Sequence, residues 1–210
     1  EWAVMYPNRV GRLVALATTA AASAQQIGWS LVGRRAIETD PNFVGGDYYD
    51  RAPGHGPHAG LAVARSVAQI TYRSELAYAE KFGRARMSLR GDLAAPVRYD
   101  VESYLDYHGE KLARRFDANS YLRVNRAMDL HDLGRGRGGV PNALARIGAP
   151  TQVISIDSDG LYPPYQQQDL YRGLRAVGVD SGFRMIHSIE GHDGFLLETD
   201  DISETVTAMR

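Results

Sequence analysis

The chain has 210 residues, of which 44% are hydrophobic and 23% charged, and this suits one globular domain with room for a sub-domain. Its 24 Lys and Arg nearly balance 25 Asp and Glu, and a formal net charge of −1 argues against a general polyanion binder. No apolar run approaches the roughly 18 to 20 residues that span a bilayer. The absence of Cys excludes disulfide scaffolds, cysteine nucleophiles and Cys-based zinc sites. We therefore expect a cytoplasmic protein with neither nucleic acid nor membrane as a partner.

The first 19 residues are expected to belong to an α/β core. The opening segment, residues 1–7, has neither an initiator Met nor a signal-peptide pattern, and it is typical of the last turns of a helix that stops at Pro7. Residues 10–18 form a short apolar run without alternation, as in a strand buried on both faces of a parallel sheet. A chain that opens in the middle of a helix is expected to be a fragment of a longer protein.

Residues 20–148 are expected to form a helical lid inserted into that core. No strand pattern occurs in this range, and helical periodicity extends over residues 23–39, 59–82, 101–115 and 119–131. Loops rich in Gly, Pro and Asp separate these stretches.

Residues 149–210 return to an α/β pattern. Residues 151–156 and 183–189 are apolar runs that predict two further strands. A helix is predicted between them over residues 164–177, since two prolines stand at its start and a glycine just past its end. Residues 198–209 predict a terminal helix. The fold class is therefore α/β, with strand and helix alternating.

An acid and a histidine follow the last two predicted strands. Asp159 comes directly after one strand, and His192 lies between two glycines after the next. Open α/β sheets keep their sites at the carboxyl edge of parallel strands, and Asp followed by His is the second half of the Ser–Asp–His order of α/β-hydrolases. In such a triad Asp orients the imidazole, which acts as general base. The alternative is that Asp157 or Asp159 caps the following helix and that His192 is a solvated loop residue.

The nucleophile of such a triad is expected in a Gly-x-Ser-x-Gly turn between a strand and a helix. No serine of this sequence stands in that motif. We therefore expect the nucleophile a few residues upstream of Glu1, in a segment that this chain does not include.

Three further residues are candidates for binding a substrate. Arg65 and Tyr72 are seven residues apart and share one face of a predicted helix, where guanidinium and phenol can hold a carboxylate. Asp193, beside His192, can take an amino group. The alternative is that Arg65 is a surface residue and Tyr72 an aromatic of the lid core. No metal site is expected, because the nearby pair His55 and His58 has no third ligand in sight.

Several segments together resemble the homoserine O-acetyltransferase family. The resemblance covers essentially the whole chain, but only roughly the second half of the family's sequence. It rests on residues 1–10, 104–105, 109–121, 131–139, 158–163 and 191–196, among which the string Arg-Phe-Asp-Ala-Asn-Ser-Tyr at 115–121 is the most specific.

The resemblance implies an α/β-hydrolase fold and a ping-pong transfer of acetyl from acetyl-CoA to the hydroxyl of L-homoserine, in methionine biosynthesis. Carried over by motif, His192 is the base, Asp159 orients it, and Arg65, Tyr72 and Asp193 bind the amino-acid end of homoserine. Acetyl-CoA is then a co-substrate, and no permanently bound cofactor is expected. The resemblance also implies a homodimer formed through the lids. Because the nucleophile lies in the missing N-terminal half, the fragment alone is expected to be inactive.

The sequence leaves other functions open. A homoserine succinyltransferase or a serine O-acyltransferase of the same family would share these motifs, and a plain esterase would share only Asp159 and His192. Arg65, Tyr72 and Asp193 argue against the esterase, which needs no grip on an amino acid. A non-catalytic lid or dimerisation fragment is a further alternative. The choice of acyl donor depends largely on residues outside this chain.

Overall fold

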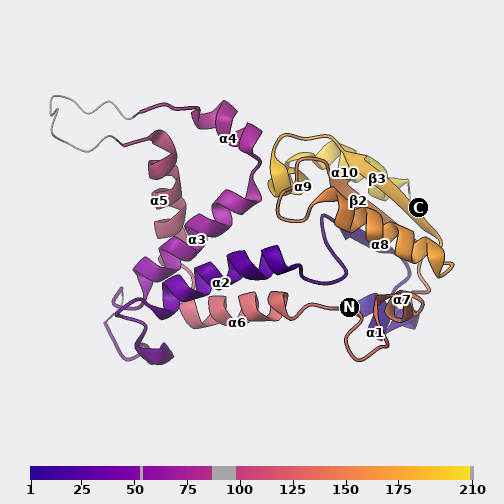
Figure 1. Cartoon of the computed structure of the whole chain (residues 1–210), viewed down its shortest axis with the longest axis horizontal. Helices are drawn as coiled ribbons and strands as arrows, with labels where there is room; N and C mark the ends of the chain where they lie inside the picture. The colour runs from indigo at the N-terminus through magenta and orange to yellow at the C-terminus, as the bar shows by residue number, and fades with distance from the viewer. Residues whose placement is uncertain (53, 87–97, 209–210) are drawn as a thin grey trace. The chain divides into compact units, whose positions relative to one another are not determined.

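The computed structural model describes residues 1–52, 54–86 and 98–208, which form two compact units. The sheet unit consists of Glu1–Ser23, Tyr72–Ser74 and Leu130–Arg210. The helical unit consists of Ala24–Thr71 and Glu75–Asp129. Figure 1 draws the elements of both units in chain order from indigo to yellow.

Three parallel strands form the sheet, in the order β1-β2-β3 (Figure 1). They are β1 (Leu13–Leu16), β2 (Thr151–Ile156) and β3 (Ser181–Ile186). All three predicted strands are confirmed, although β3 begins and ends earlier in the chain than predicted. Only β2 is buried along nearly its whole length, because it is the central strand; the expected burial of β1 on both faces is wrong, since its residues are half-buried.

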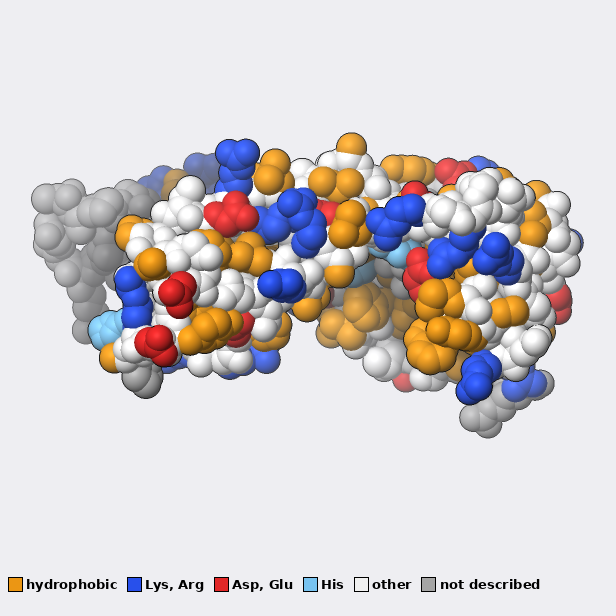
Figure 2. All heavy atoms as spheres, turned by 90° about the horizontal axis from the view of Figure 1, so that it is seen from below, with side chains coloured by type: hydrophobic (Ala, Val, Ile, Leu, Met, Phe, Trp, Pro, Cys, Tyr) orange, Lys and Arg blue, Asp and Glu red, His pale blue; other side chains and the backbone are white. Residues whose placement is uncertain are grey.

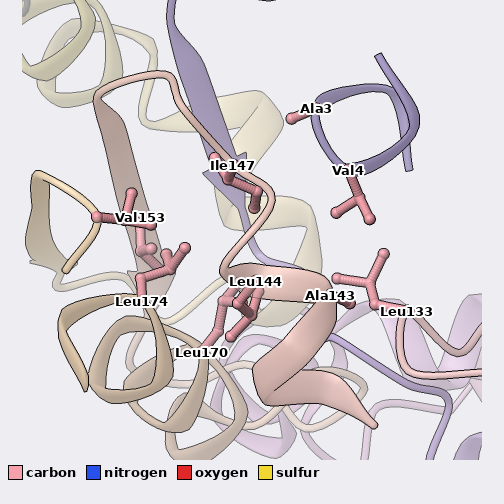
Figure 3. Close-up of a cluster of buried hydrophobic side chains, with 10 residues drawn as sticks. Ala3, Val4, Leu133, Ala143, Leu144, Ile147, Val153, Leu170 and Leu174 are labelled. Carbon is pink, nitrogen blue, oxygen red and sulfur yellow. The ribbon is translucent and has the colours of Figure 1, made fainter. Parts of the chain in front are cut away.

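The two faces of β2 pack into two separate hydrophobic clusters. Because successive side chains of a strand point to opposite faces, Val153 packs on one side, with Leu174 of α8 (Pro164–Ala176). The same cluster includes side chains of α1 (Trp2–Met5) and α7 (Val140–Leu144) (Figure 3). The predicted helical ending at the start of the chain and the predicted helix between the strands are thus confirmed.

The other face of β2 carries Ile154 and Ile156, both fully buried. They pack with Ile186 of β3 and with the partly buried Ile202 of α10 (Thr199–Thr207), which confirms the predicted terminal helix. The central strand is therefore covered on both faces, as a parallel sheet requires.

The helical unit has a core of its own, formed by Ile37, Leu61, Ala64, Ala113 and Ala118. A buried ion pair between Arg34 and Asp129 joins two of its helices. The long helices are α2 (Ala24–Glu38), α3 (His58–Tyr72), α4 (Glu75–Phe82), α5 (Asp100–Ala113) and α6 (Ala118–Asp129), and the last residue of α3 groups with the sheet unit.

Asp117 connects the start of α6 to the loop before α3. Its carboxylate accepts hydrogen bonds from the Tyr48 hydroxyl at 2.5 Å and from the Ser120 backbone N–H at 2.7 Å. Burial raises the pKa of Asp117, but these hydrogen bonds together with one from Tyr49 outweigh it, so that its pKa is lowered. Asp117 and Ser120, which belong to the string at 115–121, thus have a structural role in the helical unit.

Two boundaries differ from those expected from the sequence. The predicted helix over 59–82 is two helices, because α3 ends at Tyr72 and α4 starts at Glu75. Residues 130–148, expected in the insertion, group with the sheet unit, since Ala143 and Leu144 of α7 are fully buried in its core. Short helical turns were not predicted; they are Pro7–Arg9, Val44–Gly46, η3 (Gly191–Asp193) and α9 (Gly194–Leu197).

Candidate active site

Asp159 and His192 meet at one edge of the sheet unit. Asp159 lies in the turn after β2, and His192 lies in η3, after β3. Because these strands are parallel, their carboxyl ends share an edge. The His192 Nδ1 atom is 2.7 Å from Asp159 Oδ2, so the predicted contact between the two side chains is confirmed.

The Asp159 carboxylate also closes the turn in which it lies. Its Oδ1 accepts the backbone N–H groups of Leu161 and Tyr162, at 2.9 and 2.8 Å, and its side chain is fully buried. The N-cap of the following helix α8 is Pro163, with no side-chain capping bond, so the capping alternative is wrong. Asp159 is thus held rigidly by the backbone while its second oxygen orients His192.

Asp157 has a different partner. Its carboxylate contacts His187 Nδ1 at 2.8 Å and accepts the Ser188 backbone N–H at 3.0 Å. Burial raises the pKa of Asp157, but the Ser188 N–H and His187 outweigh it and lower the pKa. Asp157 therefore fixes the start of the loop after β3, while Asp159 contacts the imidazole.

Three aromatic rings surround the imidazole of His192. The ring centroids of Tyr162, Phe195 and Tyr72 lie 5.1, 5.0 and 6.2 Å from that of His192. Burial raises the pKa of Tyr162, and the negative charge of Asp159 adds to the effect. The Tyr162 phenol therefore stays protonated at neutral pH and is available as a hydrogen-bond donor.

The residues expected to bind substrate do not all lie in one unit. Tyr72, the last residue of α3, groups with the sheet unit beside His192, so the alternative of a lid-core aromatic is wrong. Asp193 follows His192, and its Oδ2 is 3.8 Å from the Nε atom of Arg73. Arg65 lies on α3 within the helical unit and is half-buried.

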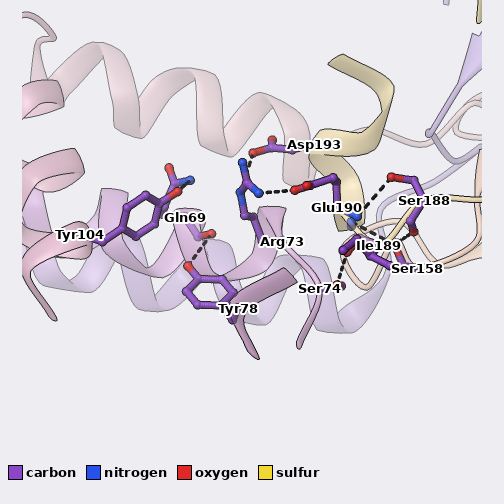
Figure 4. A network of polar contacts seen from close by, with 11 residues as sticks. Gln69, Arg73, Ser74, Tyr78, Tyr104, Ser158, Ser188, Ile189, Glu190 and Asp193 are labelled. Carbon is purple, nitrogen blue, oxygen red and sulfur yellow. Dashed lines mark hydrogen bonds and ion pairs between the residues drawn. The ribbon is translucent and has the colours of Figure 1, made fainter. Parts of the chain in front are cut away.

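The sequence interpretation missed Arg73 and Glu190, which form an ion pair (Figure 4), and Glu190 stands two residues before His192 in the chain. The two residues are 117 positions apart, and no periodicity or motif connects them. No local signal marks Arg73, because helical periodicity continues through it and predicts an unbroken helix over residues 59–82. Arg73 lies in the break of that helix, and its guanidinium contacts the loop of His192 there.

The chain is similar in sequence to curated proteins along nearly its whole length. A homoserine O-acetyltransferase of Thermobifida fusca (strain YX) is 52% identical over 203 residues, which are 97% of this chain and 52% of that protein. The chain resembles homoserine O-acetyltransferases. The resemblance inferred from the motifs is thus confirmed, and the chain spans about half the length of the curated relatives that it matches. No protein-family model matches it.

Solved structures show the fold. The crystal structure of homoserine O-acetyltransferase from Bacillus anthracis matches with a TM-score of 0.83 at 23% identity, over 94% of this chain and 52% of that one. Esterase E22 matches with a TM-score of 0.82 at 22% identity, over 98% of this chain and 55% of that one. The predicted α/β-hydrolase fold is confirmed for the part that this chain spans.

The arrangement is suited to proton transfer at one ring nitrogen. The contact with Asp159 uses Nδ1 of His192, so Nε2 is the nitrogen that can face a reacting hydroxyl. Within the described ranges, no three His, Asp or Glu side chains gather as a metal-binding group. In the same residues, no helix combines the length and apolar character needed to cross a bilayer.

Proposed function

We propose that this chain supplies the base and the orienting acid of a homoserine O-acetyltransferase. The observation that carries the proposal is the 2.7 Å contact between Asp159 and His192 at the carboxyl edge of the sheet. The similarity to homoserine O-acetyltransferases along nearly the whole chain supports the choice of reaction. The nucleophilic serine is proposed to lie in a segment that precedes Glu1 in the complete protein.

In the first half-reaction, His192 Nε2 takes the proton of the serine hydroxyl as the serine oxygen attacks the thioester carbonyl of acetyl-CoA. The carbon–sulfur bond breaks, and the imidazolium returns the proton to the departing CoA thiolate. The negative Asp159 stabilises the imidazolium and holds the tautomer with its proton on Nδ1. The product of this step is an acetyl-serine.

In the second half-reaction, His192 Nε2 takes the proton of the homoserine hydroxyl, whose oxygen attacks the acetyl-serine carbonyl. The bond to the serine oxygen breaks, and His192 gives the proton to that oxygen. The products are O-acetylhomoserine and the free serine. The same nitrogen thus serves both halves of a ping-pong cycle.

The amino-acid end of homoserine is proposed to bind to Arg65, Tyr72 and Asp193. The guanidinium and the phenol take its carboxylate, and Asp193 takes its ammonium group. A carboxylate has lone pairs for more than one donor, so Asp193 can contact both Arg73 and an ammonium group. Acetyl-CoA enters as a co-substrate without a permanently bound cofactor, and a reaction that consumes it favours a cytoplasmic location.

Three other activities differ from the proposed one in the acyl donor or in the acceptor. The similarity to esterase E22 favours hydrolysis as a second candidate, since water can replace homoserine at the acyl-serine. A homoserine succinyltransferase or a serine O-acyltransferase would keep His192 and Asp159 and change one substrate. Assays of the complete protein with acetyl-CoA or succinyl-CoA, against homoserine, serine or water, separate these cases.

The decisive test is His192→Ala in the complete protein. We expect the release of CoA and the formation of O-acetylhomoserine to stop in this variant, while the melting temperature stays near that of the wild type. Exposed His187→Ala is the matched control and should keep its activity. A His192→Ala protein that turns over at a wild-type rate would overturn the proposal. Residues 1–210 alone should be inactive, and activity without any further segment would contradict the placement of the serine.

Homodimerisation through the helical unit is proposed as well. Exposed large apolar side chains on its helices support it, because such faces mark interfaces. Figure 2 shows hydrophobic side chains among charged ones on the face that it draws. Light scattering of the complete protein at micromolar concentration should give the mass of a dimer, and a monomer would contradict the proposal. The exposed side chains are Leu31, Val32, Val63, Ile70, Leu76, Tyr107, Val124 and Met128.

A further inference from the structure

Arg73 lies between two carboxylates on the loop that carries His192. Its Nη1 atom forms an ion pair with Glu190, and its Nε is 3.8 Å from Asp193 Oδ2 (Figure 4). The three side chains are largely buried, with exposed fractions of 18%, 28% and 21%. Ion pairs with little access to water are screened less by salt than surface pairs. The attraction between Arg73 and the two carboxylates is therefore strong enough to limit movement of the loop.

The backbone of the same segment packs directly against the loop. A Cβ atom on Gly191 would lie 2.5 Å from the Ser74 nitrogen and 2.7 Å from the Arg73 carbonyl carbon, so only glycine fits there. Gly191 also has φ of +71°, which other residues rarely adopt. The Ser74 hydroxyl donates to the Ile189 carbonyl oxygen. Arg73 and Ser74 therefore contact residues that come before His192 in the chain, and Arg73 also contacts Asp193, which follows it.

From this geometry we propose that Arg73 is a positioning residue, which holds the loop from Ser188 to Asp193 so that His192 Nε2 faces the reacting hydroxyl. The inference rests on the proposed function, because it assigns Arg73 a role in the same acyl transfer. Arg73 acts through Glu190 and Asp193, on either side of His192. The break between α3 and α4 then has a function, because Arg73 lies in it.

The charges around His192 give this role a measurable signature. Asp159 faces the imidazole from the turn after β2, Tyr162 from the segment before α8, and Tyr72 from the end of α3. The loop itself adds the two carboxylates that Arg73 pairs. Removing the guanidinium leaves the carboxylates of Glu190 and Asp193, two residues before and one residue after His192 in the chain, without their counter-charge, which favours the protonated ring.

The test compares Arg73→Gln, Arg73→Lys and the control Arg172→Gln, which breaks an exposed ion pair on α8. In the complete enzyme we expect Arg73→Gln to lower kcat by about tenfold to a hundredfold, as for a misplaced catalytic group. The acid limb of its kcat profile should move to higher pH, because the base must be neutral to act. Arg73→Lys should restore the limb and part of kcat, and Arg172→Gln should match the wild type.

A second variant separates position from charge. Gly191→Ala disturbs the loop and keeps every charge, so it should lower kcat and leave the acid limb in place. If Arg73→Gln lowers only the melting temperature, with kcat and the pH profile unchanged, Arg73 has a structural role and the inference is wrong. The proposed function fails separately, if His192→Ala is fully active or if the wild-type enzyme transfers no acyl group to homoserine.

Discussion

Replacing Asp159 in two ways separates its role in orienting His192 from its role in the turn. In Asp159→Asn the amide oxygen can still accept the N–H groups of Leu161 and Tyr162, which Oδ1 accepts at 2.9 and 2.8 Å. The amide nitrogen then faces His192 Nδ1 and donates to it. This forces the ring proton onto Nε2, so His192 can no longer accept a proton from a hydroxyl.

The magnitudes differ between the two replacements. The wrong tautomer in Asp159→Asn should lower kcat by about 10⁴-fold, or about 5.4 kcal/mol in the activation barrier. Asp159→Ala should lose comparable activity and in addition leave two partly buried N–H groups without an acceptor. At about 1 kcal/mol for each lost hydrogen bond, it should cost about 2 kcal/mol of stability that Asp159→Asn largely keeps.

Two measurements on the complete protein test this reasoning. CoA release with saturating homoserine gives kcat, and thermal or urea unfolding gives the loss of stability. Asp169→Asn serves as the control, since Asp169 forms an exposed ion pair with Arg172 on α8 and has no contact with the loop of His192. The reasoning is refuted if Asp159→Asn keeps a tenth or more of the activity, or if it loses as much stability as Asp159→Ala.

Three more predictions concern the helical unit. Arg65→Ala should impair the second half-reaction and raise the KM for homoserine, while the burst of CoA release in stopped flow persists; a lost burst would show that Arg65 serves CoA or the fold. The tyrosine and backbone hydrogen bonds hold the pKa of Asp117 below its unfolded value of 3.8. Its contribution to the free energy of unfolding should therefore be complete above that value and be lost as the pH falls through the folded pKa. The free energy of unfolding of Asp117→Asn should lack this loss. An Asp117→Asn protein that loses stability with acid as the wild type does would contradict the prediction. Gly60→Ala places a Cβ 2.4 Å from the Ala36 carbonyl oxygen and should destabilise the protein by about 1 to 3 kcal/mol, whereas Gly28→Ala, with open space, should stabilise it by up to about 1 kcal/mol; equal melting temperatures would refute the reasoning.

Local patterns in the sequence were enough to predict the elements around the candidate site. The apolar run at 151–156 and the proline pair at the start of α8 carry local signals, and both elements form as predicted. Asp159 and His192 were found because parallel strands present their carboxyl ends at one edge, a rule that needs only the order of the elements. Their contact could therefore be predicted before any coordinate was known.

The contacts between the α3–α4 break and the loop of His192 could be found only from the tertiary structure. The break after Tyr72 has no Gly or Pro in the sequence to mark it, and helical periodicity continues across it. At the break Arg73 forms an ion pair with Glu190, and Gly191 leaves room for the backbone of Ser74. These partners are more than a hundred residues apart along the chain. The energies of their interactions therefore depend on the assembled fold, and no local sequence pattern predicts them.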